Sequence, residues 1–380
     1  MKIKKFLSLL LAVAMLVTLL AACGKSEQNP PKGNDDSVPG KSAYGDVVAN
    51  GDYTFYVIYK SVSSDFWRAA IQGSESEAAL LGVNATVTGP ASNTDIADQV
   101  QLLNNAINAK PDGIALAASD AEAVMDSLKA AQAAGIPVIC INSGVPGAPE
   151  GSVLATAKTD NYSAGALAAS NLYEAIADKV KNASSPVRIG VLNQDATSDS
   201  IISRGLGFID KMIELITADG KNVAVVGNDK YVADCKNAGD EASADVILEV
   251  RVPSQATSEL CATEAGVLLN KSDLIAVMAT NSETTEGLLT ADEMLCKLGS
   301  NPTSDILAAG FDSSPAICAA VESGVLFGAV TQSPLYQGQI AIDLLIMVAN
   351  GEEVHDEETP CCWYNAQNIN DPDVAPNLQR

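Results

Sequence analysis

The residues of this chain best suited to chemistry are amides, a carboxylate and aromatic rings that come soon after apolar stretches. Planar Asn and Gln amides and an Asp carboxylate pair well with the vicinal hydroxyls of a polyol, because each hydroxyl both donates and accepts. An aromatic ring adds a flat surface for the C–H face of such a molecule. These residue types agree with a hydroxyl-rich small molecule as the ligand. The candidates of these types are Phe66, Trp67, Asn142, Asn281, Asp312 and Gln332, and the hydroxyl of Ser64 is a further candidate.

Lys60 adds a positive charge to this set, suited to an anionic or strongly polarised oxygen. A buried lysine without a carboxylate nearby is costly, so we expect Asp312 or Asp160 to be its partner. Four members of the set also have a purely structural interpretation, and Phe66 and Trp67, which open a helix, could be part of the core. Asn281 is a favoured residue for a helix N-cap, and Asp312 could cap a helix that begins near Ser314. The sequence leaves both interpretations open.

Enzymatic chemistry is disfavoured by the single histidine, His355, which lies in the acidic run 352–358. One histidine removes most Ser-His-Asp, Cys-His and His-metal arrangements. The segment 61–65, which follows the first expected strand, contains no glycine, so a dinucleotide-binding loop is also missing. We predict that the protein is not an enzyme, with no catalytic residue, no cofactor and no metal.

Charge and composition limit the remaining classes of function and structure. The 380 residues carry 47 acids against 23 bases, a formal net charge of −24, which offers no basic surface for a nucleic acid. Hydrophobic residues make up 47% of the chain and charged residues 18%, values that predict a large folded core rather than general disorder.

The chain begins with a targeting pattern. Lys2, Lys4 and Lys5 precede an apolar run over 6–20, which is short for a membrane span. The run ends in Leu19-Leu20-Ala21-Ala22-Cys23, which resembles the lipobox of bacterial lipoproteins. That resemblance implies a signal peptide over 1–22 and lipidation of Cys23. The alternative is an ordinary signal peptide with a chance cysteine.

Residues 23–51 hold almost no large apolar side chain and are expected to form a disordered tether. The expected location is therefore extracytoplasmic, with the protein lipid-anchored to the cell membrane, in a periplasm or on the outer cell face. Seven cysteines remain after Cys23. Cys140 is expected to be a buried small hydrophobe, whereas a bridge between Cys235 and Cys261 is undecided.

The folded part alternates strands with helices, and its strands are continuous apolar runs. This pattern is typical of parallel sheets covered on both faces, and it predicts an α/β fold of two doubly wound lobes with about five strands each. Residues 229–244 are expected to be an inserted loop with some helix. Strands are predicted at 53–59, 84–88, 113–117, 137–141, 153–157, 187–192, 223–226, 246–252, 274–279 and 306–311, and helices at 66–81, 94–109, 120–134, 163–177 and 200–218.

We expect an N-terminal lobe of residues 52–158 plus a returning segment 334–357, and a C-terminal lobe of 159–332 plus 358–375. The chain would then cross between the lobes three times, forming a hinge. Ligands of open parallel sheets bind beyond the carboxyl ends of the strands, and this rule points to the residues that follow each strand.

Six motifs follow the expected strands: Lys60-Ser61-Val62-Ser63-Ser64-Asp65-Phe66-Trp67, Asn142-Ser143-Gly144, Lys158-Thr159-Asp160-Asn161, Thr280-Asn281-Ser282-Glu283, Gly310-Phe311-Asp312 and Thr331-Gln332-Ser333-Pro334. In their order and spacing they resemble the ribose/galactose group of periplasmic substrate-binding proteins, the receptors of ABC importers, over about Tyr53 to Asn370. The Lys60 segment and the later Gly89-Pro90 also resemble the autoinducer-2-binding branch of that group.

The resemblance implies a type 1 periplasmic-binding fold joined by a three-stranded hinge, and a monomer that closes around a sugar and delivers it to an ABC permease. It implies hydrogen bonds from Asn281, Asp312 and Gln332 to sugar hydroxyls, with the sugar ring held by Phe66 and Trp67.

The remaining candidate ligand-binding residues match the family pattern less closely. Asn142 and Ser143 stand where ribose receptors have aspartate and arginine, a departure from the family pattern. Arg204 lies near a sugar-binding arginine of the family, and its alternative role is a surface or lobe-bridging salt bridge. Asp160 is the last candidate ligand, and its alternative role is a hinge residue or a helix cap. The alternatives are an autoinducer-2-like or nucleoside ligand, or a sensory receptor that signals to a membrane kinase. A transcription regulator is excluded by the signal peptide and by the lack of a helix-turn-helix before Tyr53.

Overall fold

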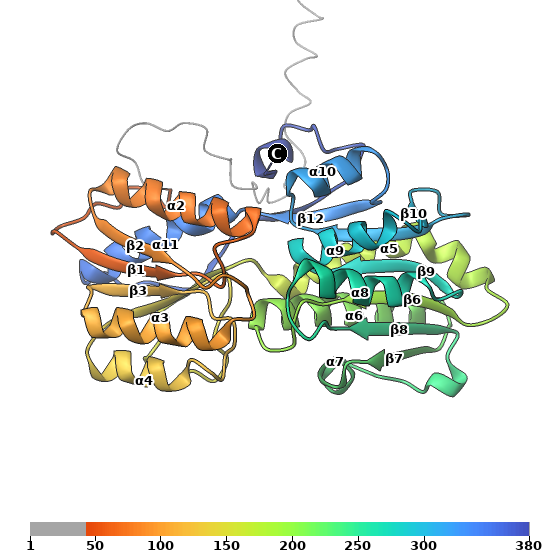
Figure 1. Cartoon of the computed structure of the whole chain (residues 1–380), viewed down its shortest axis with the longest axis horizontal. Coiled ribbons are helices and arrows are strands. Elements are labelled where there is room, and N and C mark those ends of the chain that lie inside the picture. The colour runs from red at the N-terminus through yellow and green to blue at the C-terminus, as the bar shows by residue number, and fades with distance from the viewer. Residues whose placement is uncertain (1–42, 380) are drawn as a thin grey trace, which may run out of the picture. The chain divides into compact units, whose positions relative to one another are not determined.

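The computed structural model describes residues 43–379, whose helices and strands are shown in Figure 1. The predicted signal peptide, Cys23 and most of the predicted tether lie outside the described residues. Within the described part the strands form one sheet of six and one of eight, and we call the units built on them the N-terminal and the C-terminal lobe. The prediction of two doubly wound lobes is confirmed, although each sheet has more strands than expected. The additional strands include β10 and β13, which have two residues each and therefore leave no periodic signal in the sequence.

The N-terminal lobe has a wholly parallel sheet in the order β13-β5-β4-β3-β1-β2. Side chains alternate along β1, so Phe55 and Val57 pack against α2 and α11, while Ile58 packs on the other face with α3 and α4. Figure 1 shows α2 on one side of this sheet and α3 and α4 on the other. The elements are β1 (Thr54–Ile58), α2 (Asp65–Leu81), β2 (Asn84–Thr88), α3 (Ile96–Ala109), β3 (Gly113–Leu116), α4 (Met125–Ala133), β4 (Val138–Ile141), β5 (Thr156–Lys158), α11 (Pro334–Ala349) and β13 (Glu357–Glu358).

The C-terminal lobe has the order β14-β12-β11-β9-β6-β8-β7, with β10 beside β11 and only β14 antiparallel among the described strands. Helices α5 and α6 cover one face, and α8, α9 and α10 cover the other. The elements are α5 (Asn161–Asn182), β6 (Val187–Leu192), α6 (Asp199–Ala218), β7 (Val223–Gly227), α7 (Asp229–Asp234), β8 (Val246–Arg251), α8 (Ser258–Leu269), β9 (Leu274–Ala279), α9 (Ser282–Asp292), β10 (Leu298–Gly299), β11 (Ile306–Phe311), α10 (Pro315–Glu322), β12 (Gly328–Gln332) and β14 (Cys361–Tyr364). The segment 229–244 contains α7 and one 3₁₀ turn (Glu241–Ser243), which confirms the predicted loop with some helix.

Three chain segments connect the lobes, following β5, β12 and β13, and polar side chains tie them together. The Thr159 hydroxyl donates to Gln332 Oε1 at 3.0 Å and lies 3.1 Å from the Thr359 hydroxyl. Gln337, on the first turns of α11, donates to the same Thr359 hydroxyl at 3.0 Å. Each connecting segment is therefore hydrogen-bonded to another, and these bonds meet around Thr159 and Thr359.

Two predicted boundaries are wrong. The helix expected at 120–134 begins only at Met125, because Asp120 Oδ1 accepts from the backbone N–H groups of Glu122 and Ala123 at 2.9 Å and holds a turn there. The tether expected over 23–51 ends earlier than predicted. The backbone N–H of Tyr44 donates to Asp343 at 2.9 Å, and the Tyr44 ring packs against the N-terminal core, so this aromatic residue fixes the chain to the lobe.

Candidate functional site

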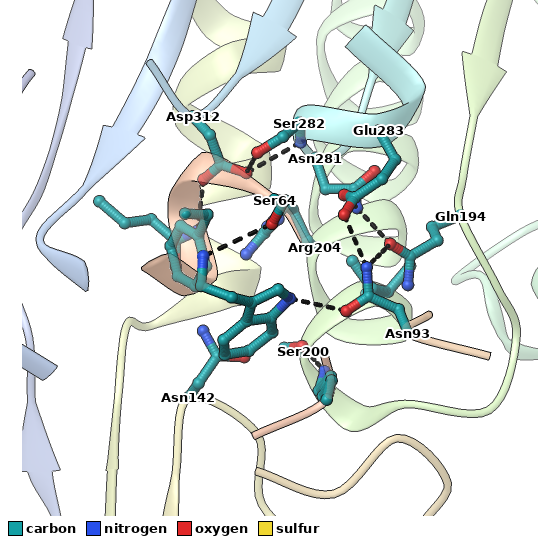
Figure 2. A pocket seen from close by; sticks show the side chains of 15 residues that line it. Ser64, Asn93, Asn142, Gln194, Ser200, Arg204, Asn281, Ser282, Glu283 and Asp312 are labelled. Carbon is teal, nitrogen blue, oxygen red and sulfur yellow. Dashed lines mark hydrogen bonds between the residues drawn. The ribbon is translucent and has the colours of Figure 1, made fainter. Parts of the chain in front are cut away.

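A cavity lies where strands of both sheets end, and residues of both lobes line it (Figure 2). Its volume is about 30 Å³, measured as the space open to the centre of a water molecule. One water needs roughly 10–15 Å³ by this measure, so a larger guest enters only when side chains or lobes move apart. The lining residues are Lys60, Ser64, Phe66, Trp67, Asn93 and Asn142 from the N-terminal lobe, and Gln194, Ser200, Ile201, Arg204, Asn281, Ser282, Glu283, Asp312 and Gln332 from the C-terminal lobe.

The aromatic side of the cavity is the first turn of α2. Ser64 is the N-cap of this helix, and its hydroxyl accepts from the backbone N–H of Trp67 at 3.4 Å. The cap starts the helix at Asp65 and so places Phe66 and Trp67 together, with ring centroids 4.9 Å apart in an edge-to-face pair. The Trp67 indole N–H donates to Asn93 Oδ1 at 2.7 Å. The indole is thus held by its polar edge, and its ring lines the cavity.

Lys60 follows β1 and reaches across to the C-terminal lobe. Its ammonium donates to the Ser200 hydroxyl at 2.8 Å, and only 2% of the residue is exposed. Burial lowers the pKa of Lys60 to about 8, opposed in part by the negative charge of Asp195. The predicted ion pair with Asp312 or Asp160 is wrong, because the side chain points toward α6 rather than toward either carboxylate.

Arg204 projects from α6 and is 2% exposed. Its Nε and Nη2 donate to Asn161 Oδ1 at 3.2 and 2.7 Å, and Nη1 donates to the carbonyl of Thr280. The guanidinium carbon lies 3.6 Å from the centroid of the Phe311 ring, a cation–π contact. Burial lowers the pKa of Arg204 to about 10, and nearby Asp312 opposes that effect. A cation is thereby fixed in a single orientation at the cavity.

Asp312 sits at the end of β11 with a φ of 69°, in the left-handed region. Asn and Asp adopt this region more readily than most residues, which also suits Asn142, with a φ of 63° after β4. Asp312 Oδ2 accepts from the backbone N–H and the hydroxyl of Ser282 at 2.9 and 2.8 Å, and Oδ1 accepts from Gln332 Nε2 at 2.8 Å. The N-cap of α10 is Ser314, so the interpretation of Asp312 as that cap is wrong.

A network of amides around Glu283 spans both lobes. Asn93 Nδ2, from the N-terminal lobe, donates to Glu283 Oε1 at 2.7 Å and to Gln194 Oε1 at 3.1 Å (Figure 2). Asn281 Nδ2 donates to Glu283 Oε2 at 2.6 Å and to Gln194. Burial, with a contribution from Asp312, raises the pKa of Glu283 to about 7. These contacts hold the two lobes together beside the Trp67 indole.

All the predicted binding residues except Asp160 line the cavity. Asp160 does not line the cavity; it is exposed and caps α5, with Oδ1 accepting from the backbone N–H of Ser163 at 3.0 Å, which confirms the interpretation of this residue as a helix cap. Asn281 lines the cavity and is also the N-cap of α9, where its side chain and that of Thr284 form a capping box. The structural interpretation of Asn281 is therefore confirmed beside its place in the cavity.

Sequence reasoning missed several lining residues. Gln194 comes two positions after β6 and Asn93 lies in the loop after β2, so the strand-end rule could have found both. Glu283 stands in one of the motifs that carried the family resemblance and was not selected. Ser200 and Ile201 lie in the first turn of α6, where no single residue type signals a ligand.

Other kinds of site are not found within residues 43–379. No group of three or more His, Cys, Asp or Glu residues there could hold a metal ion, and no helix of that part is long and apolar enough to cross a membrane. The cysteines from Cys140 to Cys362 are free thiols in this structure, including Cys235 and Cys261, whose pairing the sequence left undecided. Cys140 is buried, as predicted.

Comparison with known proteins gives concordant matches. The ribose import binding protein of Bacillus subtilis is 24% identical over 355 residues, which cover 92% of this chain and 95% of that protein. A structure described as an ABC transporter, LacI family transcriptional regulator, from Brachyspira murdochii is 30% identical, with a TM-score of 0.70, over 87% of this chain and 100% of that chain.

A third match is an ABC transporter solute binding protein from Agrobacterium vitis with bound D-fucose. It is 28% identical, with a TM-score of 0.68, over 86% of this chain and 99% of that chain. The family model described as periplasmic binding protein domain matches residues 55–353, which include both sheets apart from β13 and β14. The family model matches most of the chain, and the structure has two lobes that meet at a cavity. This chain therefore belongs to the periplasmic binding protein domain family.

Proposed function

We propose that this protein is an extracytoplasmic solute receptor that captures a sugar-like molecule between its two lobes and delivers it to an ABC importer. The observation that carries the proposal is the cavity at the strand ends of both lobes, lined by amides, charged groups and an indole ring. This chemistry suits a ring with many hydroxyls. Support also comes from the relatives, among them a ribose import protein and a solute binding protein with bound D-fucose.

The lining residues suggest a division of roles. Trp67 offers its ring to the C–H face of the sugar, and Asp312 and Gln332 accept from and donate to its hydroxyls. Arg204 donates to hydroxyl oxygens from the opposite side of the cavity. These roles make the closed cavity, rather than either lobe alone, the binding unit.

Binding and release follow from motion at the hinge. The cavity opens to a monosaccharide when the three connecting segments bend, and the sugar then replaces part of the water that hydrates the open cleft. Contacts between the lobes, such as the hydrogen bond of Asn93 with Glu283, stabilise the closed form relative to the open form. An importer that recognises the closed form would then receive only loaded receptors.

A thermal-shift screen of the purified protein against pentoses, hexoses, sugar acids, autoinducer-2 and nucleosides tests this function. A ligand at a hundred times its Kd adds about 2.7 kcal/mol of stability, which raises the Tm by several degrees. A shift with a sugar supports the proposal, and a shift with a nucleoside or autoinducer-2 alone contradicts the ligand class. Transport is tested separately, because deleting the gene should abolish uptake of the labelled sugar, whereas a purely sensory receptor would leave uptake intact.

The lipid anchor belongs to the same proposal and rests on the cysteine that follows Leu19-Leu20-Ala21-Ala22. Substituting Cys23→Ser should release the protein from the membrane fraction, with Cys296→Ser as the control at an exposed thiol of the described part. Membrane retention of the Cys23→Ser protein would contradict lipidation at that residue.

A further inference from the structure

Two buried cations lie together on one side of the cavity. Ser200 and Arg204 are four residues apart on α6 and so lie on the same helical face. The Lys60 ammonium is 2.8 Å from the Ser200 hydroxyl, which places it beside that face. Lys60 and Arg204 are each 2% exposed, and both line the cavity. The positive end of the α6 dipole, at Asp199 and Ser200, adds to the potential there.

Neither cation has an ion pair with any described carboxylate within 4.0 Å. The Lys60 ammonium has three N–H groups and uses one, toward Ser200. The Arg204 guanidinium has five N–H groups and uses three, toward Asn161 and Thr280. This side of the cavity therefore holds unused N–H donors on two buried charged groups.

The carboxylates around the cavity are already satisfied by other donors. Asp312 accepts from Ser282 and Gln332, and Glu283 accepts from amides. Asp195, behind the cavity, accepts from backbone N–H groups at its own turn and from Gln194.

Asp199, in the first turn of α6, is paired with Lys158. Together with Glu283 and Asp195 it reduces the positive potential at Lys60, but none of the three makes a direct bond to the ammonium. Buried charges are normally paired, because an unpaired buried charge costs several kcal/mol, and the missing partner here is an anion.

We propose, building on the sugar-receptor function above, that the ligand is a cyclic monosaccharide that carries a carboxylate, a uronate, and that Lys60 and Arg204 bind this group. A carboxylate supplies two acceptor oxygens, which match unused N–H groups on both cations. Its single negative charge balances one of the two positive charges, and Asp312 offsets the other.

The remainder of such a sugar meets the side of the cavity that carries the indole, the amides and the Asp312 carboxylate. Its ring faces Trp67, and its hydroxyls face Gln332 and Asp312. The carboxylate thus fixes the orientation of the sugar, because only one end of the molecule carries the charge that the α6 side of the cavity attracts.

The test is calorimetric titration of the purified protein with two pairs that share a pyranose ring and differ only in the carboxylate at C6: galactose and galacturonate, and glucose and glucuronate. In the pair that binds, the acid should bind at least about tenfold more tightly than its neutral partner. A neutral sugar that binds as tightly as its acid overturns this inference and leaves the sugar-receptor function standing. No binding by either acid, together with a thermal shift for a neutral sugar, overturns this inference alone, and no shift with any sugar of the thermal-shift screen overturns both.

The substitution Lys60→Met separates a charge contact from a general effect on the fold. It should weaken binding of the acid about tenfold and binding of the neutral partner less than about threefold. The same change at Lys129, which is exposed on α4, should alter neither. An equal loss for acid and neutral sugar in the Lys60→Met protein would contradict a contact between Lys60 and the carboxylate. Its melting temperature without ligand shows whether the fold is kept.

Discussion

Lys158 and Asp199 join the two lobes through an ion pair of 2.6 Å. Lys158 is the last residue of β5 in the N-terminal lobe, and Asp199 is the first residue of α6 in the C-terminal lobe. The same Asp199 oxygen accepts from the backbone N–H of Gly144 at 3.2 Å. One carboxylate therefore bonds two points of the opposite lobe without lining the cavity, and it favours the closed form independently of any contact with a ligand.

Substituting Asp199→Asn should weaken ligand binding about three- to tenfold, mainly through faster dissociation, because the closed form loses a half-buried ion pair. Stopped-flow kinetics and titration calorimetry measure this directly. The matched control is Glu214→Gln, which removes the exposed Lys211–Glu214 pair within the same helix. Unchanged dissociation in the Asp199→Asn protein would show that the ion pair contributes nothing to closure.

Lys60→Met should stabilise the protein without ligand. The pKa of Lys60 falls from 10.5 to about 8 on folding, so the folded chain binds fewer protons than the unfolded chain between these values. Stability of the native sequence therefore rises with pH from about 8 to 10.5, and the full cost, on the order of 3 kcal/mol, applies below pH 8.

At pH 7 the Lys60→Met protein should melt several degrees higher than the native sequence, and this difference should shrink as the pH rises toward 10.5. Differential scanning calorimetry at several pH values measures both effects. A lower Tm at pH 7 would contradict an unpaired buried ammonium at this site.

Gly165→Ala should destabilise the C-terminal lobe and disturb the cavity. A Cβ at Gly165 of α5 would lie 2.0 Å from the carbonyl oxygen of Arg204, so the two helices must separate and Arg204 must move. We expect a loss of about 1–3 kcal/mol of unfolding free energy and weaker ligand binding.

The control is Gly266→Ala in α8, where a Cβ would meet nothing within 4 Å and the protein should be slightly stabilised. Urea unfolding of both variants makes the comparison. Equal stability of the two proteins would show that the packing of α5 on α6 tolerates an added methyl group.

Trp67 should report ligand binding through its fluorescence. The chain has two tryptophans, and Trp363 lies on β14 away from the cavity. The Trp67→Phe protein should lose the fluorescence change on addition of ligand, and the Trp363→Phe protein should keep it. A change that disappears only with Trp363→Phe would place the ligand elsewhere.

Most of the residues that line the cavity could be predicted, because the residues that come after parallel strands lie together at one edge of the sheet. Asn142 and Asp312 directly follow β4 and β11, Gln332 is the last residue of β12, and Trp67 lies in the first turn of the helix after β1; the structure brings all four to the cavity. Asp160 follows β5 in the same way, but it lies in a segment that crosses between the lobes, and capping of α5 turns it to solvent. The strand-end rule does not distinguish a strand that opens to the cavity from one that leads into the hinge.

Contacts between the lobes could not be predicted from local patterns. Lys60 was expected to meet a carboxylate and meets Ser200, because its partner is set by how α6 of the other lobe faces β1. Asn93 bonds to Glu283 across 190 residues of sequence for the same reason. Such pairs depend on the closure of two separately folded lobes, which leaves no periodic or motif signal in either partner.

A crystal structure of the protein grown with the sugar that gives the largest thermal shift tests the central claim most directly. We predict that the sugar lies between the lobes, within hydrogen-bonding distance of Arg204 and Asp312, with its ring against Trp67. A sugar bound on one lobe alone, or outside the residues that line the cavity, would contradict the account.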